Sequence, residues 1–303
     1  MQDGKAEWFV KKKKKKLGDM VFGLVIGAVL LAGVGLLLYP TVANWYNESH
    51  ASRAIAAYED AIAQVSTEDY DRMMTDAQAY NMALYQTIDR WKPDEEGQAV
   101  YDSLLDVTGT GIMAYVEIPK IHVKLPIYHG TEETTLAVAV GHLEGSSLPV
   151  GGKGSHVVMS GHSALPSARL FTDLAQVEIG DVFTVSTLGQ VMTYQVDAIN
   201  VVLPYEFELF ALDPEQDYVT LVTCTPYGVN SHRLLVRGTR IFPEAEVPVE
   251  TVSQEPTESP EADASVVSTK VSIISAAVFC VLVLGGGLFV FCSHKKRNGR
   301  MQQ

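Results

Sequence analysis

Two long apolar runs divide this chain and limit where the rest of it can fold. Residues 20–39 and 271–292 contain no charged side chain, and each is long enough to cross a hydrocarbon core of about 30 Å as a helix. Six consecutive lysines at 11–16 precede the first run, and a second basic cluster at 295–297 follows the other. Because basic flanks stay in the cytoplasm, the sequence predicts both termini inside the cell and residues 41–270 outside.

The first apolar run has an alternative interpretation as a cleaved signal peptide, which also begins with a basic segment. Its apolar stretch is longer than the roughly 7–15 residues of a signal sequence, and no clear Ala-x-Ala cleavage site follows it. These two features favour a retained membrane anchor.

Charge and cysteine usage narrow the function of the segment between the two runs. Residues 41–270 contain 33 acidic and 12 basic residues, an excess of acid that disfavours nucleic-acid binding. Cys280 and Cys292 lie in the second apolar run, so Cys224 has no partner for an internal disulfide. A single thiol outside the cell points to a use of its reactivity.

Seven short runs rich in β-branched and aromatic residues, with turn residues between them, lie in the extracellular segment from residue 111 onward. These runs are 111–119, 123–128, 156–160, 182–188, 191–202, 218–223 and 233–241. Leu-Gly-Gln at 188–190 predicts a hairpin turn. So many short strands in about 130 residues predict a closed barrel or a sandwich.

Helical periodicity precedes the strands. Apolar residues at three- and four-residue spacing over 44–86 predict two helices after the first apolar run. Residues 66–69 separate them, and Ser66 or Thr67 is the expected N-cap of the second helix. A polar loop is expected at 90–97. Beyond the strands, residues 243–268 are acidic and rich in Pro, Ser and Thr, which predicts a disordered tether.

Cys224 has the surroundings of a thiol that takes part in chemistry. It ends the apolar run 220–223, and Arg233 opens the next such run nine residues later. Upstream, Ser160-Gly161-His162 closes another short apolar run. A lone thiol, a histidine at a strand end and an arginine at a strand start are the components of a thiolate acyl-transfer site.

These strings resemble the signature of the sortases, cysteine transpeptidases that attach proteins to the surface of Gram-positive bacteria. The strings at 141–149 (Gly-His-Leu-Glu-Gly-Ser-Ser-Leu-Pro) and 224–230 (Cys-Thr-Pro-Tyr-Gly-Val-Asn) resemble the class C, pilin-polymerising branch. The resemblance extends from about residue 80 to residue 241. It implies a mainly β fold, a closed eight-stranded barrel with N-terminal helices, flanked here by two transmembrane helices.

The resemblance implies a role for each site residue. Cys224 is the expected nucleophile. His162 is the expected acid toward the departing amine and base toward the incoming one. His142 is the alternative histidine, although it lies in a string that does not carry the catalytic histidine of the family.

Arg233 is the expected stabiliser of the oxyanion or of substrate carbonyls, since its planar cation carries several donors. Arg237 and Arg240 are its rivals, and Arg237 shares the face of Arg233 in a regular strand. Thr223 either supports the substrate and the oxyanion or is an ordinary strand threonine.

A lid over the site is also implied. Class C sortases typically carry Asp-Pro-aromatic before the barrel, with the acid on the catalytic arginine and the ring over the cysteine. This chain has Asp89-Arg90-Trp91 there. We expect Asp89 to pair with Arg233 and Trp91 to exclude water from Cys224, in a loop made less stiff by the loss of proline. The alternative is an ordinary exposed acidic loop.

The predicted organisation therefore has eight parts. In chain order, they are a basic cytoplasmic tail (1–19), a transmembrane helix (20–39), a helical region (40–86), a lid-like loop (87–98), the catalytic barrel (99–242), an acidic tether (243–270), a second transmembrane helix (271–292) and a basic cytoplasmic tail (293–303). The catalytic barrel is expected to face the cell wall.

The predicted function is cleavage of an LPxTG-like sorting signal between Thr and Gly through a thioester, followed by transfer to a pilin lysine in pilus assembly. The partners are pilins or surface proteins with that signal, and the membrane. Alternatives are attachment of single proteins to a peptidoglycan cross-bridge, an extracellular cysteine protease, and a non-enzymatic pilus scaffold. No cofactor, metal site or nucleic-acid partner is expected, because neither a Cys-x-x-Cys pair nor a phosphate-binding glycine loop is present.

Overall fold

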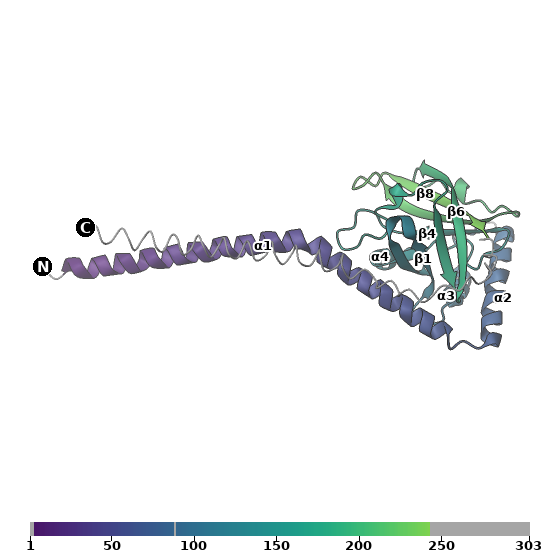
Figure 1. Cartoon of the computed structure of the whole chain (residues 1–303), viewed down its shortest axis with the longest axis horizontal. Helices are drawn as coiled ribbons and strands as arrows, with labels where there is room; N and C mark the ends of the chain where they lie inside the picture. Colours follow the sequence, from purple (N-terminus) through teal and green to yellow (C-terminus); the bar gives the residue numbers. More distant parts are fainter. Residues whose placement is uncertain (1–2, 88, 243–303) are drawn as a thin grey trace, which may run out of the picture. The chain divides into compact units, whose positions relative to one another are not determined.

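The structure is a computed structural model that describes residues 3–87 and 89–242 (Figure 1). Side chains are described from residue 20 onward. The predicted tether, the second apolar run and the C-terminal basic tail lie outside the described residues.

The first helix is longer than the sequence pattern predicts. Helix α1 extends from Asp3 to Ile62 and contains Pro40, so the expected separate helix after the apolar run is a continuation of α1. Pro40 removes one backbone hydrogen bond at a cost of about 3 kcal/mol. Helix-compatible residues continue on both sides of it, however, and the next cap is Ser66.

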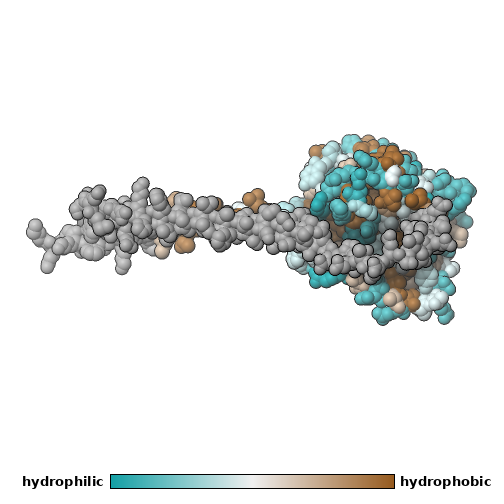
Figure 2. Space-filling model, viewed as in Figure 1, coloured by the Kyte–Doolittle hydropathy of each residue, from teal (hydrophilic) through white to brown (hydrophobic). Residues whose placement is uncertain are grey.

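One helix in the described part of the chain, Met20–Ile62, is long and apolar enough to cross a membrane. A signal sequence near the N-terminus would meet the same criterion. Its apolar side chains are exposed, with Leu36 at 76% and Leu37 at 81%. Several of them appear as brown atoms along the helix in Figure 2.

The C-terminal part of α1 packs on the barrel through one face. Ala51, Ile55 and Tyr58 follow each other at helical spacing and are buried. The Tyr58 hydroxyl donates to the Met113 carbonyl at 2.7 Å and accepts from the Leu188 amide at 3.0 Å. This single side chain therefore ties α1 both to a strand and to a hairpin turn.

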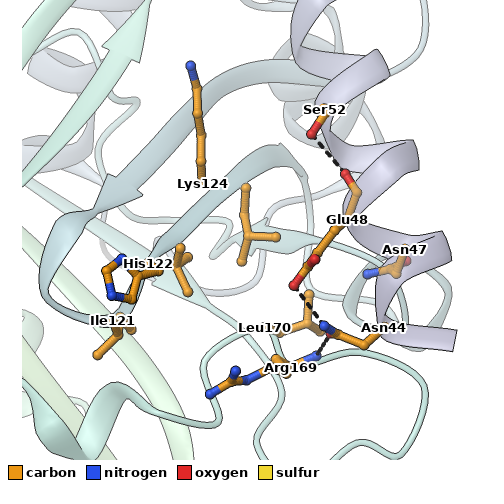
Figure 3. A pocket seen from close by; sticks show the side chains of 11 residues that line it. Asn44, Asn47, Glu48, Ser52, Ile121, His122, Lys124, Arg169 and Leu170 are labelled. Atoms are coloured by element: carbon orange, nitrogen blue, oxygen red, sulfur yellow. Dashed lines mark hydrogen bonds between the residues drawn. The ribbon is translucent and has the colours of Figure 1, made fainter. Parts of the chain in front are cut away.

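A cavity of about 240 Å³ lies between α1 and the barrel (Figure 3). Asn44 on α1 accepts from the Arg169 amide at 2.8 Å and donates to Glu48 at 2.7 Å. The cavity is lined by residues of α1, of the second strand and of the segment around Arg169. Because none of the candidate site residues lines it, this cavity is separate from the chemistry.

The second helix begins where the sequence predicts. Helix α2 (Thr67–Ala83) has Ser66 as its N-cap, whose hydroxyl accepts from the Asp69 amide at 3.1 Å. Asn81 on α2 is buried and exchanges two hydrogen bonds with Leu148, at 3.1 and 2.7 Å. A short 3-10 helix, η1 (Leu84–Gln86), follows.

A third helix corrects the predicted extent of the polar loop. Helix α3 (Glu95–Ser103) begins inside the segment expected to be loop, with Asp94 as N-cap accepting from the Gly97 amide at 2.9 Å. The signal was present as Pro93 and Asp94 followed by two glutamates, a common helix start. The loop that remains is residues 89–94, called the Trp91 loop below.

The strands form a closed barrel in the order β1-β2-β3-β4-β7-β8-β6-β5, which confirms the predicted eight-stranded barrel. Their bounds are β1 Ile112–Ile118, β2 Val123–His129, β3 Val140–His142, β4 Ser155–Ser160, β5 Val182–Thr187, β6 Gln190–Val202, β7 Asp217–Thr225 and β8 His232–Ile241. Strand β3 was not predicted, because three residues are too few to show an alternating pattern. Helix α4 (Glu133–Leu136) and the 3-10 helices η2 (Pro119–Ile121), η3 (Leu174–Gln176) and η4 (Glu208–Phe210) lie in the connections.

Two strand pairs bring distant segments together at one end of the barrel. Strands β4 and β7 are parallel, with Ser160 opposite Val222, and β7 and β8 are antiparallel, with Cys224 opposite Arg233. Alternate residues of these strands divide between two apolar clusters. The inner one is the barrel core, and the outer cluster consists of Val158, Phe210, Val222 and Leu235.

Two buried histidines predict acid sensitivity of the fold. Burial lowers the pKa of His142 and of His156 from 6.5 to about 4. Between these values the unfolded chain takes up protons that the folded chain cannot. The stability they contribute is therefore complete above pH 6.5 and is lost as pH falls toward 4.

We expect each histidine to reduce the free energy of unfolding by about 2 kcal/mol between pH 7 and pH 5. Urea unfolding of the chain in detergent, followed by near-UV circular dichroism, measures it. A His156→Gln variant should lose less stability over that interval than wild type. Equal losses would contradict the assignment. Burial raises the pKa of Asp217 and opposes the trend, so the difference between the two proteins is the informative quantity.

Candidate active site

Cys224 and Arg233 lie directly opposite each other across the β7–β8 pair. Residues two apart on a strand share a face, so Cys224 lies on the face of Val222 and Arg233 on the face of Leu235. Both of these neighbours belong to the outer cluster. The thiol and the guanidinium are therefore on the outer surface of the barrel, where a polypeptide substrate can reach them.

His162 reaches the same place through the parallel pair. Ser160 on β4 is paired with Val222 on β7. His162 lies two residues beyond Ser160, and Cys224 lies two residues beyond Val222. Backbone bonds continue past the strand end, since the Gly161 amide donates to the Val222 carbonyl at 3.0 Å. The backbone at His162 therefore lies beside the end of β7 that carries Cys224.

Two hydroxyl groups lock this junction. Thr223 donates to the Gly161 carbonyl at 2.7 Å, and Ser163 donates to the Cys224 carbonyl at 2.6 Å. Thr223 is buried, so its side chain points away from the outer face of the barrel. Its hydroxyl holds the Gly161 backbone, next to His162. That geometry gives Thr223 a positioning contact and no direct route to a substrate.

The other histidines have structural partners. His142 is fully buried, with Nε2 donating to the Ser147 carbonyl and Nδ1 accepting from the Tyr101 hydroxyl, both at 2.8 Å. His129 contacts the Leu104 carbonyl at 2.8 Å and the Gly111 carbonyl at 3.0 Å. His162 is the histidine that the fold places beside Cys224.

The rival arginines lie elsewhere on the barrel. Arg237 donates to both carboxylate oxygens of Asp197, at 3.1 and 2.8 Å, and stacks on Tyr218. It shares the face of Arg233, as expected, but lies opposite Thr220, four residues before Cys224 on β7. Arg240 packs against Tyr194. Arg233 itself donates only to carbonyl oxygens of its own turn, at 3.3 and 3.2 Å, in the described part of the chain.

The Trp91 loop covers the outer cluster. The Trp91 ring packs against Phe207 and Phe210, with ring centroids 5.3 and 6.2 Å apart, and is half-buried against the outer cluster. Gly145 makes room for it, because a Cβ there would lie 2.2 Å from the Arg90 carbonyl oxygen and 3.0 Å from the Trp91 ring. The ring therefore lies over the residues that adjoin Cys224 and Arg233 on their shared face.

The structure does not bring Asp89 and Arg233 together. Asp89 is exposed, and among the described side chains its carboxylate forms no ion pair. Arg90 instead donates to the Phe210 carbonyl at 2.7 Å, and its guanidinium lies 4.3 Å from the centre of the Trp91 ring. These contacts oppose the expectation that arginine in place of proline makes the loop less stiff.

Some residues near the site carried no signal in the sequence. Glu133 on α4 places Oε2 at 3.6 Å from His162 Nε2, a nitrogen that is buried without a hydrogen-bond partner. Gly145 lies in the 141–149 string, but its φ of +80° and its contact with the Trp91 loop are seen only in the structure. Within residues 20–87 and 89–242, no group of three or more His, Cys, Asp or Glu side chains is arranged to hold a metal ion.

The close contact at Gly145 yields a prediction. Gly145→Ala should displace the Trp91 loop, because the new methyl group cannot fit beside the Arg90 carbonyl. Hydrogen exchange at residues 89–92 should become faster. Gly109→Ala is the matched control, since its φ is +70° but no atom lies within 4 Å of the added carbon. Equal exchange in the two variants would show that the contact at Gly145 does not hold the loop.

Comparison with known proteins agrees with this geometry. The family model described as Sortase domain matches residues 116–241. The crystal structure of sortase C1 from Streptococcus agalactiae is 46% identical, with a TM-score of 0.61, and the match covers 63% of this chain and 100% of that one. Sortase C-1 from Actinomyces oris is 48% identical, with a TM-score of 0.53, and the match covers 56% of this chain and 98% of that one.

One curated relative matches over a shorter part. Sortase D of Bacillus subtilis (strain 168) is 29% identical over 129 residues, which is 42% of this chain and 62% of that protein. The chain thus matches less than two thirds of that relative's length. Family model, fold and the paired strand ends all point the same way: the chain belongs to the sortase family of cysteine transpeptidases, and the sortases that it resembles in structure are of class C.

Proposed function

We propose that this chain is a membrane-anchored class C sortase. It cleaves an LPxTG-like sorting signal between Thr and Gly and joins the threonine to a lysine amine of a pilin. The observation that supports the proposal is the strand register, which pairs Cys224 with Arg233 and, two residues before Cys224 and His162, pairs Val222 with Ser160. The similarity to sortase C1 and sortase C-1 supports class C.

Cleavage begins with the thiolate of Cys224. It attacks the threonine carbonyl carbon, forming a C–S bond and a tetrahedral oxyanion. The C–N bond to glycine then breaks, and the His162 imidazolium gives its proton to the departing amine. The products are a thioester on Cys224, a free glycine amine and a neutral imidazole.

Transfer reverses the proton flow. The neutral imidazole of His162 takes a proton from the attacking lysine amine, the new C–N bond forms, and the C–S bond breaks to return the thiolate. Glu133 Oε2 lies 3.6 Å from His162 Nε2. The two half-reactions therefore use Cys224 and His162 in opposite order.

Arg233 supplies positive charge where negative charge develops. Among the described residues its guanidinium forms no ion pair and donates only to carbonyl oxygens. It is therefore available to donate to the oxyanion or to a substrate carbonyl. Donors that are positioned in advance stabilise a transition state without reorganising.

The Trp91 loop is proposed to act as a lid. Trp91 packs against the outer cluster, which contains Val222 and Leu235, the residues two positions from Cys224 and Arg233 on the same face. An extended peptide that reaches Cys224 along this face would have to displace the ring. The ion pair between Asp89 and Arg233 is not part of this proposal.

The proposed membrane topology rests on the sequence and on one helix. Helix α1 contains the apolar run and the basic N-terminal segment, and its C-terminal part packs on the barrel through Tyr58. A two-pass chain with both termini in the cytoplasm would hold the barrel on the outer surface of the membrane. The second pass, 271–292, lies outside the described residues.

Formation of the thioester tests the reaction. The full chain in detergent is mixed with a Leu-Pro-x-Thr-Gly peptide and examined by intact-mass spectrometry. We expect an acyl adduct that is larger in Trp91→Ala than in wild type and absent in Cys224→Ala. Equal adduct in wild type and Trp91→Ala would remove the lid role. No adduct on a folded Trp91→Ala protein would contradict the proposed substrate.

The role of Arg233 gives a second test. Arg233→Lys keeps the charge but loses the planar donors, so the rate of thioester formation should fall by about 100-fold. Arg237→Lys is the matched control on the same face of β8, and its rate should stay near wild type because Arg237 is held by Asp197. Equal rates for the two variants in a quenched-flow assay would contradict the assignment.

A further inference from the structure

The residue between the predicted lid acid and the lid aromatic ring makes contacts that neither of its neighbours makes. We propose that Arg90 is the latch of the Trp91 loop. It holds Trp91 on the outer face of the barrel beside Cys224, and it makes release of the ring depend on movement of the β6–β7 loop (residues 203–216). This inference rests on the proposed role of that loop as a lid and identifies what keeps it closed.

Arg90 joins two loops that are far apart in sequence. One terminal nitrogen, Nη2, donates to the Phe210 carbonyl at 2.7 Å, across 120 positions of sequence. The same guanidinium lies over the Trp91 ring at 4.3 Å from its centre. Trp91 in turn packs on the Phe207 and Phe210 rings of the β6–β7 loop. Arg90, Trp91, Phe207 and Phe210 therefore form one cluster of packed side chains, which the hydrogen bond from Arg90 to the Phe210 carbonyl ties together.

The environment of Arg90 makes its hydrogen bond to the Phe210 carbonyl costly to break. Its other terminal nitrogen, Nη1, is buried and has no hydrogen-bond partner among the described residues, and burial lowers the pKa of the Arg90 guanidinium. A half-buried cation without a carboxylate partner depends on the contacts that remain, here one charged hydrogen bond and one aromatic face. The Phe210 carbonyl would lose its donor at the same moment.

The β6–β7 loop is anchored at a second point. The Nδ1 of His156 on β4 donates to the Ala211 carbonyl at 2.9 Å, next to the residue that Arg90 holds. Nε2 accepts from the Thr220 hydroxyl at 2.8 Å. Residues up to Phe210 can therefore move with Arg90 while Ala211 stays fixed to the barrel. Any ligand that shifts Phe207 or Phe210 would loosen the latch.

The contrast with Asp89 gives the proposal its test. Asp89 is exposed, and none of the described side chains pairs with its carboxylate, so its removal should leave the loop closed. Lys92 lies in the same loop, is exposed and provides a second comparison. Neither residue contacts the thiol. If Asp89 were the residue that holds the Trp91 loop closed, Asp89→Ala would expose Cys224 and Arg90→Ala would not.

The measurement is the rate at which iodoacetamide alkylates Cys224 in the full chain in detergent. Peptide mass spectrometry separates Cys224 from Cys280 and Cys292. The reagent is small and neutral, so a change of charge in the loop does not alter its local concentration. We expect Arg90→Ala to react about tenfold faster than wild type, Arg90→Lys to be intermediate, and Asp89→Ala and Lys92→Ala to match wild type.

A second measurement separates a latch from general loosening. Hydrogen exchange at residues 203–210 should be faster in Arg90→Ala than in Lys92→Ala, because the β6–β7 loop loses its contact as well, while exchange in β7 and β8 stays unchanged. If Arg90→Ala lowers the melting temperature of the barrel, Arg90→Lys decides the question. Alkylation at the wild-type rate in a folded Arg90 variant, or a larger increase in Asp89→Ala, would overturn the proposal.

Alkylation needs neither a sorting signal nor an acceptor amine. If the proposed role of Arg90 is wrong, thioester formation would still occur, and some other contact would control the position of the Trp91 loop. Failure of the proposed reaction would leave the alkylation rates as expected and give no acyl adduct on any variant. The two experiments therefore test the two proposals separately.

Discussion

The parallel pairing of β4 with β7, continued by the antiparallel pairing of β7 with β8, is the constraint on which the rest of this protein depends. Because Ser160 lies opposite Val222 and Cys224 opposite Arg233, three segments that are distant in sequence end at one level. A slip of one residue in β7 would turn Cys224 from the outer face into the core. Thr223 and Ser163 lock this register with hydroxyl bonds to backbone carbonyls, so the chemistry depends on groups that would never touch a substrate.

The outer face has two uses in this fold. Its apolar residues, Val158, Val222 and Leu235, lie on the strands that carry the site, and they are covered by Trp91 and by the rings of the β6–β7 loop. A face that stayed bare would be an exposed apolar patch next to a reactive thiol. The covering loop is held by Arg90, and Gly145 is the position that lets it come close. In the proposed function, protection of the thiol and access to it are two positions of this loop.

The helices show how far local patterns lead. Ser66 and its following acidic turn predicted the start of α2 correctly, because a cap is a local hydrogen bond between neighbours. The apolar run and the first predicted helix after it are one continuous helix, because Pro40 interrupts one hydrogen bond without ending α1. Helix α3 was missed because a short polar helix has little apolar periodicity. Pro93 and Asp94 are nevertheless a common start of a helix. Strand β3 was missed because its three residues carry no alternation, and tertiary pairing with β2 and β4 alone makes it a strand.

The sequence by itself determined the seven longer strands, the hairpin turn at Leu188 and the candidate triad of Cys224, His162 and Arg233. The strands and the turn depend on alternation and on turn residues, which are local, whereas the roles in the triad were implied by the resemblance to the sortases. Only the tertiary structure decided that His162 rather than His142 lies at the end of β4 next to β7, that Arg237 is bound to Asp197, and that Asp89 stays away from Arg233. The contact between Arg90 and Phe210 spans 120 positions. Such contacts depend on how the barrel closes, and no local pattern records which distant carbonyl a side chain will meet.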